Sequence, residues 1–263
     1  MLIYIFSAIF IYLIIGILLF VMQRHMTFNK SGGKPYRPEK YGLRNIKEIY
    51  IDTPDNLKLL AWYHKPNNSN PVLIYFHGNS YDIGERAYRI ERYINQGWGV
   101  LLLSWRGYSG NNGTPTEKNL YIDGRASIEW VKKNTNFQNS DIILYGESLG
   151  CAVAVELGLH DKFKSIVLEA PFTSLGDIGQ KKYPIYPVKY LTLDKFDNLS
   201  KIERMLSPLL IIHGKKDEII PYIHSLELFQ KAKEPKKHVC IDEAMHNNLY
   251  DYNIEKEVFN FNS

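Results

Sequence analysis

The sequence has few cysteines and no concentrated positive charge. Its two cysteines, Cys151 and Cys240, form no CxxC pair or other metal-ligand spacing, which argues against a zinc module or a disulfide scaffold. We expect Cys151 in a buried helix and Cys240 in a strand, both as small core residues. The net charge is only +4 and no basic run concentrates it, so nucleic-acid binding has little support.

Known cofactor motifs are also missing. The sequence contains no phosphate loop, no dinucleotide fingerprint and no metal motif, so we expect no cofactor and no metal. It also lacks internal repeats and low-complexity tracts. The 263 residues are 45% hydrophobic, which is enough for one domain with its own core. Nothing in the composition indicates an oligomeric state.

The first 22 residues, MLIYIFSAIFIYLIIGILLFVM, contain no charged side chain. As a helix they would extend roughly 33 Å at about 1.5 Å per residue, which matches a bilayer core of roughly 30 Å. A signal peptide would have a basic start and a small-x-small cleavage site, and a buried core helix would not need every face apolar. Residues 1–22 are therefore predicted to be a transmembrane anchor, with a signal peptide and a core helix as alternatives.

Basic residues follow this span, and no side-chain charge precedes it. They are Arg24, Lys30, Lys34, Arg37 and Lys40. The positive-inside rule then predicts a single-pass protein whose soluble domain is cytoplasmic. Four Asn-x-Ser/Thr sequons, at Asn29, Asn67, Asn112 and Asn198, argue only weakly for the lumenal side, because an Asn-rich sequence contains chance sequons.

Behind the span, residues 23–45 form a polar connector that contains Gly and Pro. As a flexible chain it would have an r.m.s. length of roughly 25–30 Å. Residues 46–52 and 57–64 alternate apolar and polar positions around Asp55-Asn56, which predicts a hairpin. Continuous apolar runs predict further strands at 71–77, 99–105, 141–146, 165–170, 208–214 and 238–242. Helical patterns lie at about 83–96, 116–133, 149–161, 222–232 and 249–260.

This alternation predicts an α/β fold over residues 46–263, with a mostly parallel sheet covered by helices on both faces. The span, residues 1–22, has no place in that sheet. Residues 171–205 interrupt the rhythm with three prolines and several aromatics between two strands. An insertion there would cover the carboxyl edge of the sheet, where open α/β proteins bind ligands, so we expect a lid.

The lid contains enough apolar side chains to line an acyl groove. They are Phe172, Tyr183, Ile185, Tyr186, Tyr190, Leu191 and Leu193. The alternative is that these side chains only pack the lid onto the sheet, since sequence alone does not separate buried from exposed aromatics.

The central motif is Gly146-Glu147-Ser148-Leu149-Gly150, a G-x-S-x-G pattern. It follows a predicted strand and opens a predicted helix, which is the strand–turn–helix context that a nucleophile elbow requires. The turn needs small residues on both sides of the serine, and it holds the hydroxyl at a helix N-terminus. Ser148 is therefore the predicted nucleophile, and an ordinary Gly-bounded βα turn is the alternative.

A serine hydroxyl needs a base, and in this context the chain order is Ser, acid, His. Of His224, His238 and His246, only His246 falls in a loop just after a strand, at the carboxyl edge. Asp217 follows the strand at 208–214 at the same edge and can hold the imidazole tautomer. Asp194 and Asp197, in the lid, are weaker candidates for the acid. Glu218 is adjacent to Asp217, and its side chain should point elsewhere.

The third requirement is an oxyanion hole. His77-Gly78-Asn79-Ser80 follows a buried strand, and Gly78 allows the backbone to pass close beneath a substrate. The backbone N–H groups of Asn79 and Leu149 are the two predicted donors. A simple βα loop is the alternative interpretation of this segment.

Several segments occur in a fixed order along the chain: FHGNSYDIG, SWRGYSGNNGTPTE, ILYGESLGCAVA, LEAPFTSL, FDN, LLIIHGKKDEIIP and AMHN. Over about residues 46–260, together with the anchor, the chain resembles the single-span α/β-hydrolase-domain serine hydrolases. These are related to prolyl oligopeptidases and include protein depalmitoylases. The resemblance implies the α/β-hydrolase fold, Ser148, Asp217 and His246 as triad, and Asn79 and Leu149 as oxyanion donors. One departure is Ser104-Trp105-Arg106-Gly107-Tyr108, where the family commonly reads Asp-Tyr-Arg-Gly-Tyr, and it weakens inference about the substrate.

Three functions compete on the sequence. The first is a serine esterase or thioesterase that acts, through an acyl-enzyme, on small-molecule, lipid or acylated-protein substrates at a bilayer. The second is a serine peptidase or aminoacyl hydrolase with the same triad, although a propeller-sized extra domain is missing. The third is a non-catalytic membrane adaptor, which the intact triad and oxyanion loop argue against. Fold alone does not decide between them.

Overall fold

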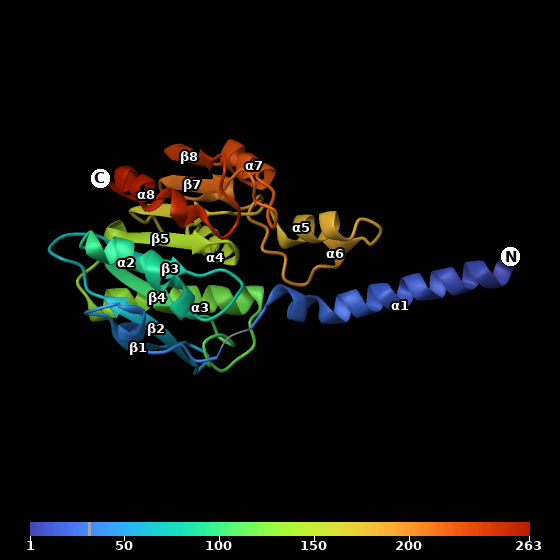
Figure 1. The fold of residues 1–263 in the computed structure, drawn as a ribbon, viewed down its shortest axis with the longest axis horizontal. Helices are drawn as coiled ribbons and strands as arrows, with labels where there is room; N and C mark the ends of the chain where they lie inside the picture. Colours follow the sequence, from blue (N-terminus) through green and yellow to red (C-terminus); the bar gives the residue numbers. More distant parts are fainter. Residues whose placement is uncertain (31–32) are drawn as a thin grey trace.

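The computed structural model describes residues 1–30 and 33–263, so Ser31 and Gly32, at the centre of the predicted connector, lie outside the described residues. An eight-stranded sheet forms the middle of the domain, and a long helix projects from it (Figure 1). The strands are β1 (Lys47–Asp52), β2 (Lys58–His64), β3 (Val72–Phe76), β4 (Gly99–Leu103), β5 (Ile142–Glu147), β6 (Ser165–Glu169), β7 (Leu209–Gly214) and β8 (Lys236–Ile241). All of them fall on predicted strand segments.

The strand order is β1-β2-β4-β3-β5-β6-β7-β8. β1 and β2 form the predicted antiparallel hairpin, β2 pairs antiparallel with β4, and every later pairing is parallel. The carboxyl ends of β3 to β8 therefore share one edge of the sheet. The loops that follow β3, β5, β7 and β8 carry the residues predicted for the site, so the topology brings these loops to a common edge.

Helices cover both faces of the sheet, as predicted. The side chains of β5 alternate between two cores: Ile142 and Leu144 join one, and Ile143 and Tyr145 join the other. The first core includes residues of α3 (Glu117–Asn134), α4 (Leu149–Leu157) and α7 (Ile223–Lys231); the second includes residues of α2 (Ala87–Asn95) and α8 (Glu255–Asn262). Short 3₁₀ turns complete the connections at Pro38–Tyr41, Ile83–Arg86, Asn139–Asp141, Ile202–Arg204 and Leu249–Tyr252.

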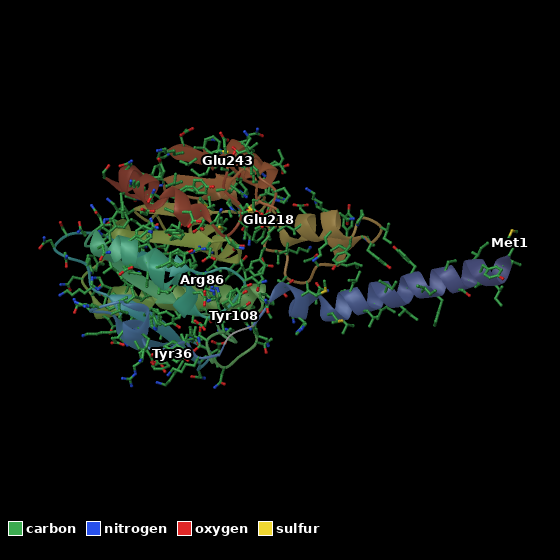
Figure 2. The ribbon with its side chains drawn as sticks, viewed as in Figure 1. Met1, Tyr36, Arg86, Tyr108, Glu218 and Glu243 are labelled. Atoms are coloured by element: carbon green, nitrogen blue, oxygen red, sulfur yellow. The ribbon has the colours of Figure 1, made fainter. Side chains whose placement is uncertain are left out.

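The projecting helix is α1 (Leu2–Thr27), and it has no buried residue. Its mean hydropathy of 2.9 and its 26 residues make it long and apolar enough to cross a membrane. Met1 lies at its free end, far from Arg86 and Tyr108 in the domain (Figure 2). α1 takes no part in the sheet, as predicted.

The connector is not the free tether that its composition predicts. The helix continues through Arg24 to Thr27, Phe28 is buried against Phe196, and the Asn29 N–H donates to Asn79 Oδ1 at 2.8 Å. These contacts fix the first part of the connector to the domain, because the Phe28 ring packs on the lid and the Asn29 backbone binds the loop after β3. The flexible-chain estimate is therefore wrong for residues 23–30.

The lid, residues 171–205, contains α5 (Leu175–Lys182) and α6 (Val188–Leu191), and it lies beside α1 (Figure 1). The seven apolar side chains predicted for an acyl groove differ in burial, and Tyr183 is half-buried. Phe172 belongs to the core below the lid, and Tyr186 is buried against Tyr12 of α1. Four others are exposed: Ile185, Tyr190, Leu191 and Leu193. The lid therefore presents part of its apolar surface outward.

Both cysteines are free, and only one of them lies in the core. Cys151 is fully buried in α4, as predicted. Cys240 lies in β8, but β8 is the last strand of the sheet and Cys240 is only partly buried. The prediction of a core position is therefore wrong for Cys240, because an edge strand is covered on one side only.

Candidate active site

A sharp turn connects β5 to α4 and places Ser148 at its apex. Ser148 has φ 51° and ψ −111°, a backbone conformation that side-chain-bearing residues rarely adopt. A Cβ at Gly150 would collide with the Phe76 carbonyl, and one at Gly146 would collide with the backbone of Cys151. The two glycines are thus required for the close approach of α4 to β5 and β3, which raises the Ser148 hydroxyl at the helix N-terminus.

His246 and Asp217 lie next to this turn, on the loops that follow β8 and β7. His246 Nε2 is 3.2 Å from Ser148 Oγ, and His246 Nδ1 is 2.7 Å from Asp217 Oδ2. The structure therefore brings the three predicted residues, 98 and 29 positions apart in the chain, into one hydrogen-bonded row. This geometry allows proton transfer from the hydroxyl to an imidazole that the carboxylate orients.

The Asp217 carboxylate is held by donors on both oxygens. Oδ1 accepts hydrogen bonds from the Ile219 and Ile220 N–H groups at 2.9 and 2.8 Å. His213 Nε2 lies 3.0 Å from Oδ2 and 2.9 Å from the Ile220 carbonyl, and since both neighbours are acceptors, Nε2 carries the hydrogen. Sequence reasoning missed His213. The available signal was a histidine inside an apolar strand, four residues before the predicted acid.

The pKa values of Asp217 and His246 are shifted in opposite directions, in each case against the effect of burial. Burial raises the pKa of Asp217, but the hydrogen bonds from His213 and His246 outweigh burial and hold that pKa well below its usual range. Burial lowers the pKa of His246, but the hydrogen bond and negative charge of Asp217 outweigh it and raise that pKa above its ordinary 6.5. The carboxylate is therefore charged at neutral pH, and it stabilises an imidazolium.

The loop after β3 passes directly over the serine. A Cβ at Gly78 would lie 3.4 Å from the Ser148 Cβ, which shows how close the two turns are. Within the described residues, neither the Asn79 N–H nor the Leu149 N–H donates a hydrogen bond. Leu149 is the first residue of α4, where an N–H has no partner within the helix. Both predicted donors are thus free to bind a developing negative charge.

Neighbouring side chains hold this loop in place. The Asn79 side-chain oxygen accepts hydrogen bonds from the Tyr108 hydroxyl and the Asn29 N–H, both at 2.8 Å. The Trp105 indole N–H donates to the His77 carbonyl at 2.9 Å. The segment that departs from the family pattern, Ser104–Tyr108, therefore supports the loop rather than leaving it free.

Comparison with known proteins decides the family. Residues 110–248, more than half of the chain, match the prolyl oligopeptidase family. The chain belongs to the prolyl oligopeptidase family. Among curated relatives, an uncharacterized protein of Mycobacterium tuberculosis is 34% identical over 88% of this chain and 84% of its own length. Human alpha/beta hydrolase domain-containing protein 17B is 32% identical over 72% of this chain and 65% of its own length.

Solved structures agree on the fold of this family member. An esterase of Pyrococcus furiosus superposes with a TM-score of 0.72 at 22% identity, covering 86% of this chain and 92% of the esterase. An acetyl xylan esterase of Paenibacillus sp. R4 gives a TM-score of 0.68 at 18% identity, covering 82% and 84%. The predicted α/β-hydrolase fold is thereby confirmed. Its family membership and its curated relatives make the chain a hydrolase.

A buried ionic network lies beneath the Ser148 turn of this hydrolase. The Glu147 carboxylate, inside the G-x-S-x-G motif, accepts from Arg86 at 2.9 and 3.1 Å, and Arg89 bridges it to Glu169. Burial raises the pKa of Glu147, but the charges of Arg86 and Arg89 outweigh burial and hold it well below its ordinary value. No sequence pattern predicts this network, because the motif accepts many residues at that position and the arginines that bind Glu147 lie 58 or more positions away.

The weaker sequence candidates have other partners. His224 Nδ1 lies 2.8 Å from Thr173 Oγ1, and His238 Nε2 lies 3.2 Å from Ser225 Oγ. Asp194 pairs with Arg24 at 2.8 Å and also accepts from the Glu117 N–H at the start of α3. Asp197 accepts from the Ser200 N–H, and Glu218 is exposed, as predicted. In the described part of the chain, none of them hydrogen-bonds to Ser148 or His246.

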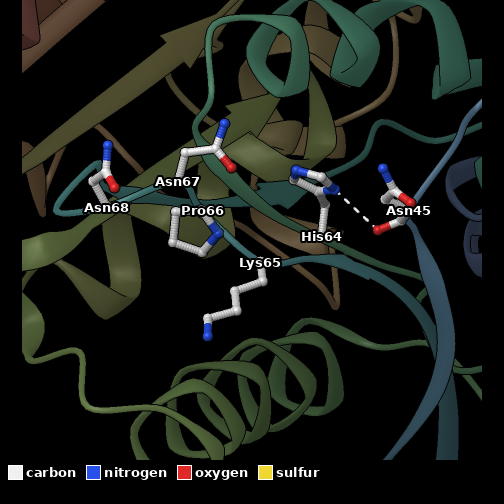
Figure 3. Close-up of a pocket in the computed structure, with 6 residues that line it drawn as sticks. All are labelled: Asn45, His64, Lys65, Pro66, Asn67 and Asn68. Carbon is white, nitrogen blue, oxygen red and sulfur yellow. Dashed lines mark hydrogen bonds between the residues drawn. The ribbon is translucent and has the colours of Figure 1, made fainter.

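An open hollow of about 700 Å³ lies away from this site. Figure 3 shows the residues that line it. His64 lies at the end of β2 opposite the start of β4, so the hollow is at the amino edge of the parallel strands. His64 Nδ1 is 3.0 Å from the Asn45 carbonyl. The lining residues are Asn45, His64, Lys65, Pro66, Asn67 and Asn68, and none of them has a hydroxyl or thiol nucleophile. The candidate residues Ser148, Asp217 and His246 lie at the opposite edge.

From the His246–Asp217 contact we predict the pH at which His246 titrates. Followed by NMR on protein with isotope-labelled histidine, the His246 imidazole should titrate with a midpoint above about 6.5, the ordinary histidine value. Neutral imidazole then predominates only above that midpoint. Asp217→Asn removes the charge that raises the pKa, so the midpoint should fall. A midpoint unchanged by Asp217→Asn would contradict the electrostatic interpretation. His246→Ala identifies the signal.

Proposed function

We propose that this hydrolase cleaves carboxylic ester or thioester bonds through an acyl-enzyme formed on Ser148. Its substrates are acyl or lipid-linked molecules at a membrane: small molecules, lipids or acylated proteins. The observation that carries the proposal is the hydrogen-bonded row from Ser148 Oγ through His246 to Asp217, with distances of 3.2 and 2.7 Å. The names of two structural relatives, an esterase and an acetyl xylan esterase, favour ester chemistry.

In the first half of the proposed reaction, Ser148 Oγ attacks the acyl carbonyl carbon, and its proton passes to His246 Nε2. The carbonyl oxygen becomes an oxyanion, and the Asn79 and Leu149 N–H groups stabilise it. When the tetrahedral intermediate collapses, the bond to the alcohol or thiol breaks. The leaving group takes the proton from His246, and the acyl group stays on Ser148.

The second half uses the same groups with water as the nucleophile. His246 accepts a proton from the water as its oxygen attacks the acyl-enzyme carbonyl, and the same N–H groups receive the oxyanion. Collapse breaks the bond to Ser148 Oγ, which recovers its proton from His246. A carboxylic acid leaves. Asp217 stays ionised throughout, in keeping with its lowered pKa, and stabilises the imidazolium in both steps.

The membrane part of the proposal rests on α1 and on where it joins the domain. α1 has the length and apolarity of a span, and we propose that it anchors the chain with the domain on the cytoplasmic side. Asn29, two residues beyond α1, is hydrogen-bonded to the loop that carries the proposed oxyanion donor. The site edge would then face the membrane surface, which favours substrates held there.

A serine peptidase is the second candidate, because the family to which the chain belongs is named for oligopeptidases. The same row of residues would perform amide hydrolysis, so the site geometry does not separate the two. The experiments therefore include aminoacyl amide substrates beside esters.

Ser148→Ala should abolish labelling by a fluorophosphonate probe and lower kcat by about 10⁴–10⁶ while the fold is retained. The hydroxyl is the atom that the probe modifies, and the smaller side chain fits the same turn. The measurements are in-gel labelling, ester hydrolysis and circular dichroism. Labelling that persists at another serine would reject Ser148 as the nucleophile.

His246→Ala should lower kcat nearly as much as Ser148→Ala, and Asp217→Asn should lower it by about 10⁴ through the wrong imidazole tautomer. His238→Ala is the matched control, because His238 is also a partly buried histidine but contacts Ser225 instead. Its activity should stay near wild type. A comparable loss in His238→Ala, with an unchanged melting curve, would mean that the base is misassigned.

The substrate class is tested with acetyl, octanoyl and palmitoyl esters and thioesters, and with aminoacyl amides. Each is presented in solution and in liposomes, to the full chain and to a chain without residues 1–22. We expect the full chain to prefer long acyl groups in liposomes and the shortened chain to lose that preference, because tethering raises the local substrate concentration. A strict preference for acetyl or aminoacyl substrates that ignores the anchor would favour the peptidase or a small-ester hydrolase.

A further inference from the structure

The lid and the membrane helix form one packed unit. The rings of Tyr12 and Tyr186 stack with centroids 4.6 Å apart and planes 8° apart. The Tyr12 hydroxyl donates to the Ile185 carbonyl at 2.9 Å, and the Tyr186 hydroxyl donates to the Tyr12 carbonyl at 3.2 Å. Nearer the domain, Arg24 pairs with Asp194 of the lid at 2.8 Å. The lid therefore accompanies α1 from Arg24 as far as Tyr12.

The length of α1 that contacts the lid sets how deep in a membrane the lid would lie. Tyr12 lies 12 residues before Arg24, which at about 1.5 Å per residue is roughly 18 Å along the helix axis. If Arg24 marks the membrane surface, a helix tilted by as much as about 40° still carries Tyr12 roughly 14 Å deep, close to the middle of a core of about 30 Å. A segment packed on Tyr12 then lies within the bilayer.

The opposite arrangement, with the lid in water, conflicts with the sequence of α1. It would leave only residues 2–11 for the membrane, roughly 15 Å of helix, or half of the hydrocarbon core. The uncharged run from Leu13 to Met22 would then lie in water, although its side chains are large and apolar and α1 has no buried residue. The apolarity of α1 therefore favours a lid that enters the membrane.

The outward side chains of the lid suit a lipid environment. Ile185 is 71% exposed, Tyr190 82%, Leu191 47% and Leu193 51%. Large apolar side chains gathered on an exposed surface indicate a binding surface, and tyrosine is enriched where membrane and water meet. Exposed lysines on the lid, Lys181 and Lys182, can extend their charged ends toward lipid headgroups. The charge of Lys189, within the segment, is paired with Asp177 at 2.7 Å.

The backbone of the lid is also prepared for an environment without water. Non-helical backbone at membrane depth must find protein partners for its polar groups. Besides Tyr12, Gln23 of α1 serves this purpose: its amide accepts from the Leu193 N–H at 2.8 Å and donates toward the Leu191 carbonyl at 3.5 Å. Gln180 of α5 donates to the Tyr186 and Pro184 carbonyls at 2.9 and 3.3 Å.

We propose that lid residues 183–193 insert into the bilayer leaflet beside the C-terminal half of α1, with lipid acyl chains covering Ile185, Tyr190 and Leu193. This inference rests on the membrane anchor proposed above. It makes the lid a second membrane-binding element.

The test measures depth directly and needs no substrate. Single cysteines are placed at Ile185, Ile9 or Leu206 in a Cys240→Ser background, where the remaining Cys151 is fully buried. Each full-length variant is labelled with an environment-sensitive nitrobenzoxadiazole dye and reconstituted into phosphatidylcholine vesicles with a minor fraction of phosphatidylglycerol. Matched vesicles contain lipids with a nitroxide quencher on the acyl chain. Leu206 is the control, because it is 55% exposed and its N–H bonds to Gly158 at the far end of α4.

We expect the labels on Ile185→Cys and Ile9→Cys to show blue-shifted emission and strong quenching, and the label on Leu206→Cys to show neither. An Ile185 label that behaves like the Leu206 label, while the Ile9 label is quenched, would overturn lid insertion and leave the anchor intact. An unquenched Ile9 label would overturn the anchor itself, and lid insertion with it. Neither result bears on ester cleavage, which the substrate series tests separately.

Discussion

The turn at Ser148 is the constraint on which the rest of the site depends. A non-glycine residue at φ 51° and ψ −111° is strained, and such strain costs on the order of 1–3 kcal/mol. The surrounding structure holds the backbone in this conformation. Gly146 and Gly150 allow α4 to pack closely against β5 and β3. The same turn leaves the Leu149 N–H without a helical partner and raises the serine hydroxyl toward His246. The backbone strain, the unpartnered Leu149 N–H and the position of the Ser148 hydroxyl therefore have one origin.

The buried charges beneath the turn are better explained by positioning than by stability. Burying an ion pair costs desolvation free energy that mutual attraction often only balances, so a network such as Arg86–Glu147–Arg89–Glu169 is weak grounds for a stable fold. Its members, however, come from the 3₁₀ turn Ile83–Arg86, from α2, from the Ser148 turn and from β6. The pairing holds Glu147 inward, and with it the backbone of the adjacent Ser148. Asp217 follows the same logic, since four hydrogen bonds to its two oxygens leave its carboxylate one orientation toward His246.

The features that local sequence patterns determine, the strands and the turns that follow them, could be predicted. Each strand of the sheet is an apolar or alternating run in the sequence. Because parallel strands have their carboxyl ends at one edge, the residues that follow them, Ser148, Asp217 and His246, could be chosen as site candidates from the sequence. His213 and the arginine network could not, because their partners are chosen by side-chain packing across the fold and not by spacing. The outward direction of Ile185 and Tyr190 was equally hidden, since the same residues suit a groove, a core or a lipid surface. The prediction of a flexible connector is wrong for residues 23–30. A Gly- and Pro-containing polar segment is flexible only where no contact with the domain holds it, and here such contacts exist.

That connector changes how anchor and site relate. A flexible tether would let the domain tumble above a membrane, and the site edge would face it only part of the time. Here Arg24 pairs with Asp194, whose other oxygen accepts from the first N–H of α3, and Asn29 bonds to the side chain of Asn79. One contact joins the end of α1 to the lid and the start of α3, and the other joins it to the loop that lies against Ser148. The direction of α1 and the direction of the site edge are therefore set together, and a domain held in this way presents one edge to whatever surface holds the helix.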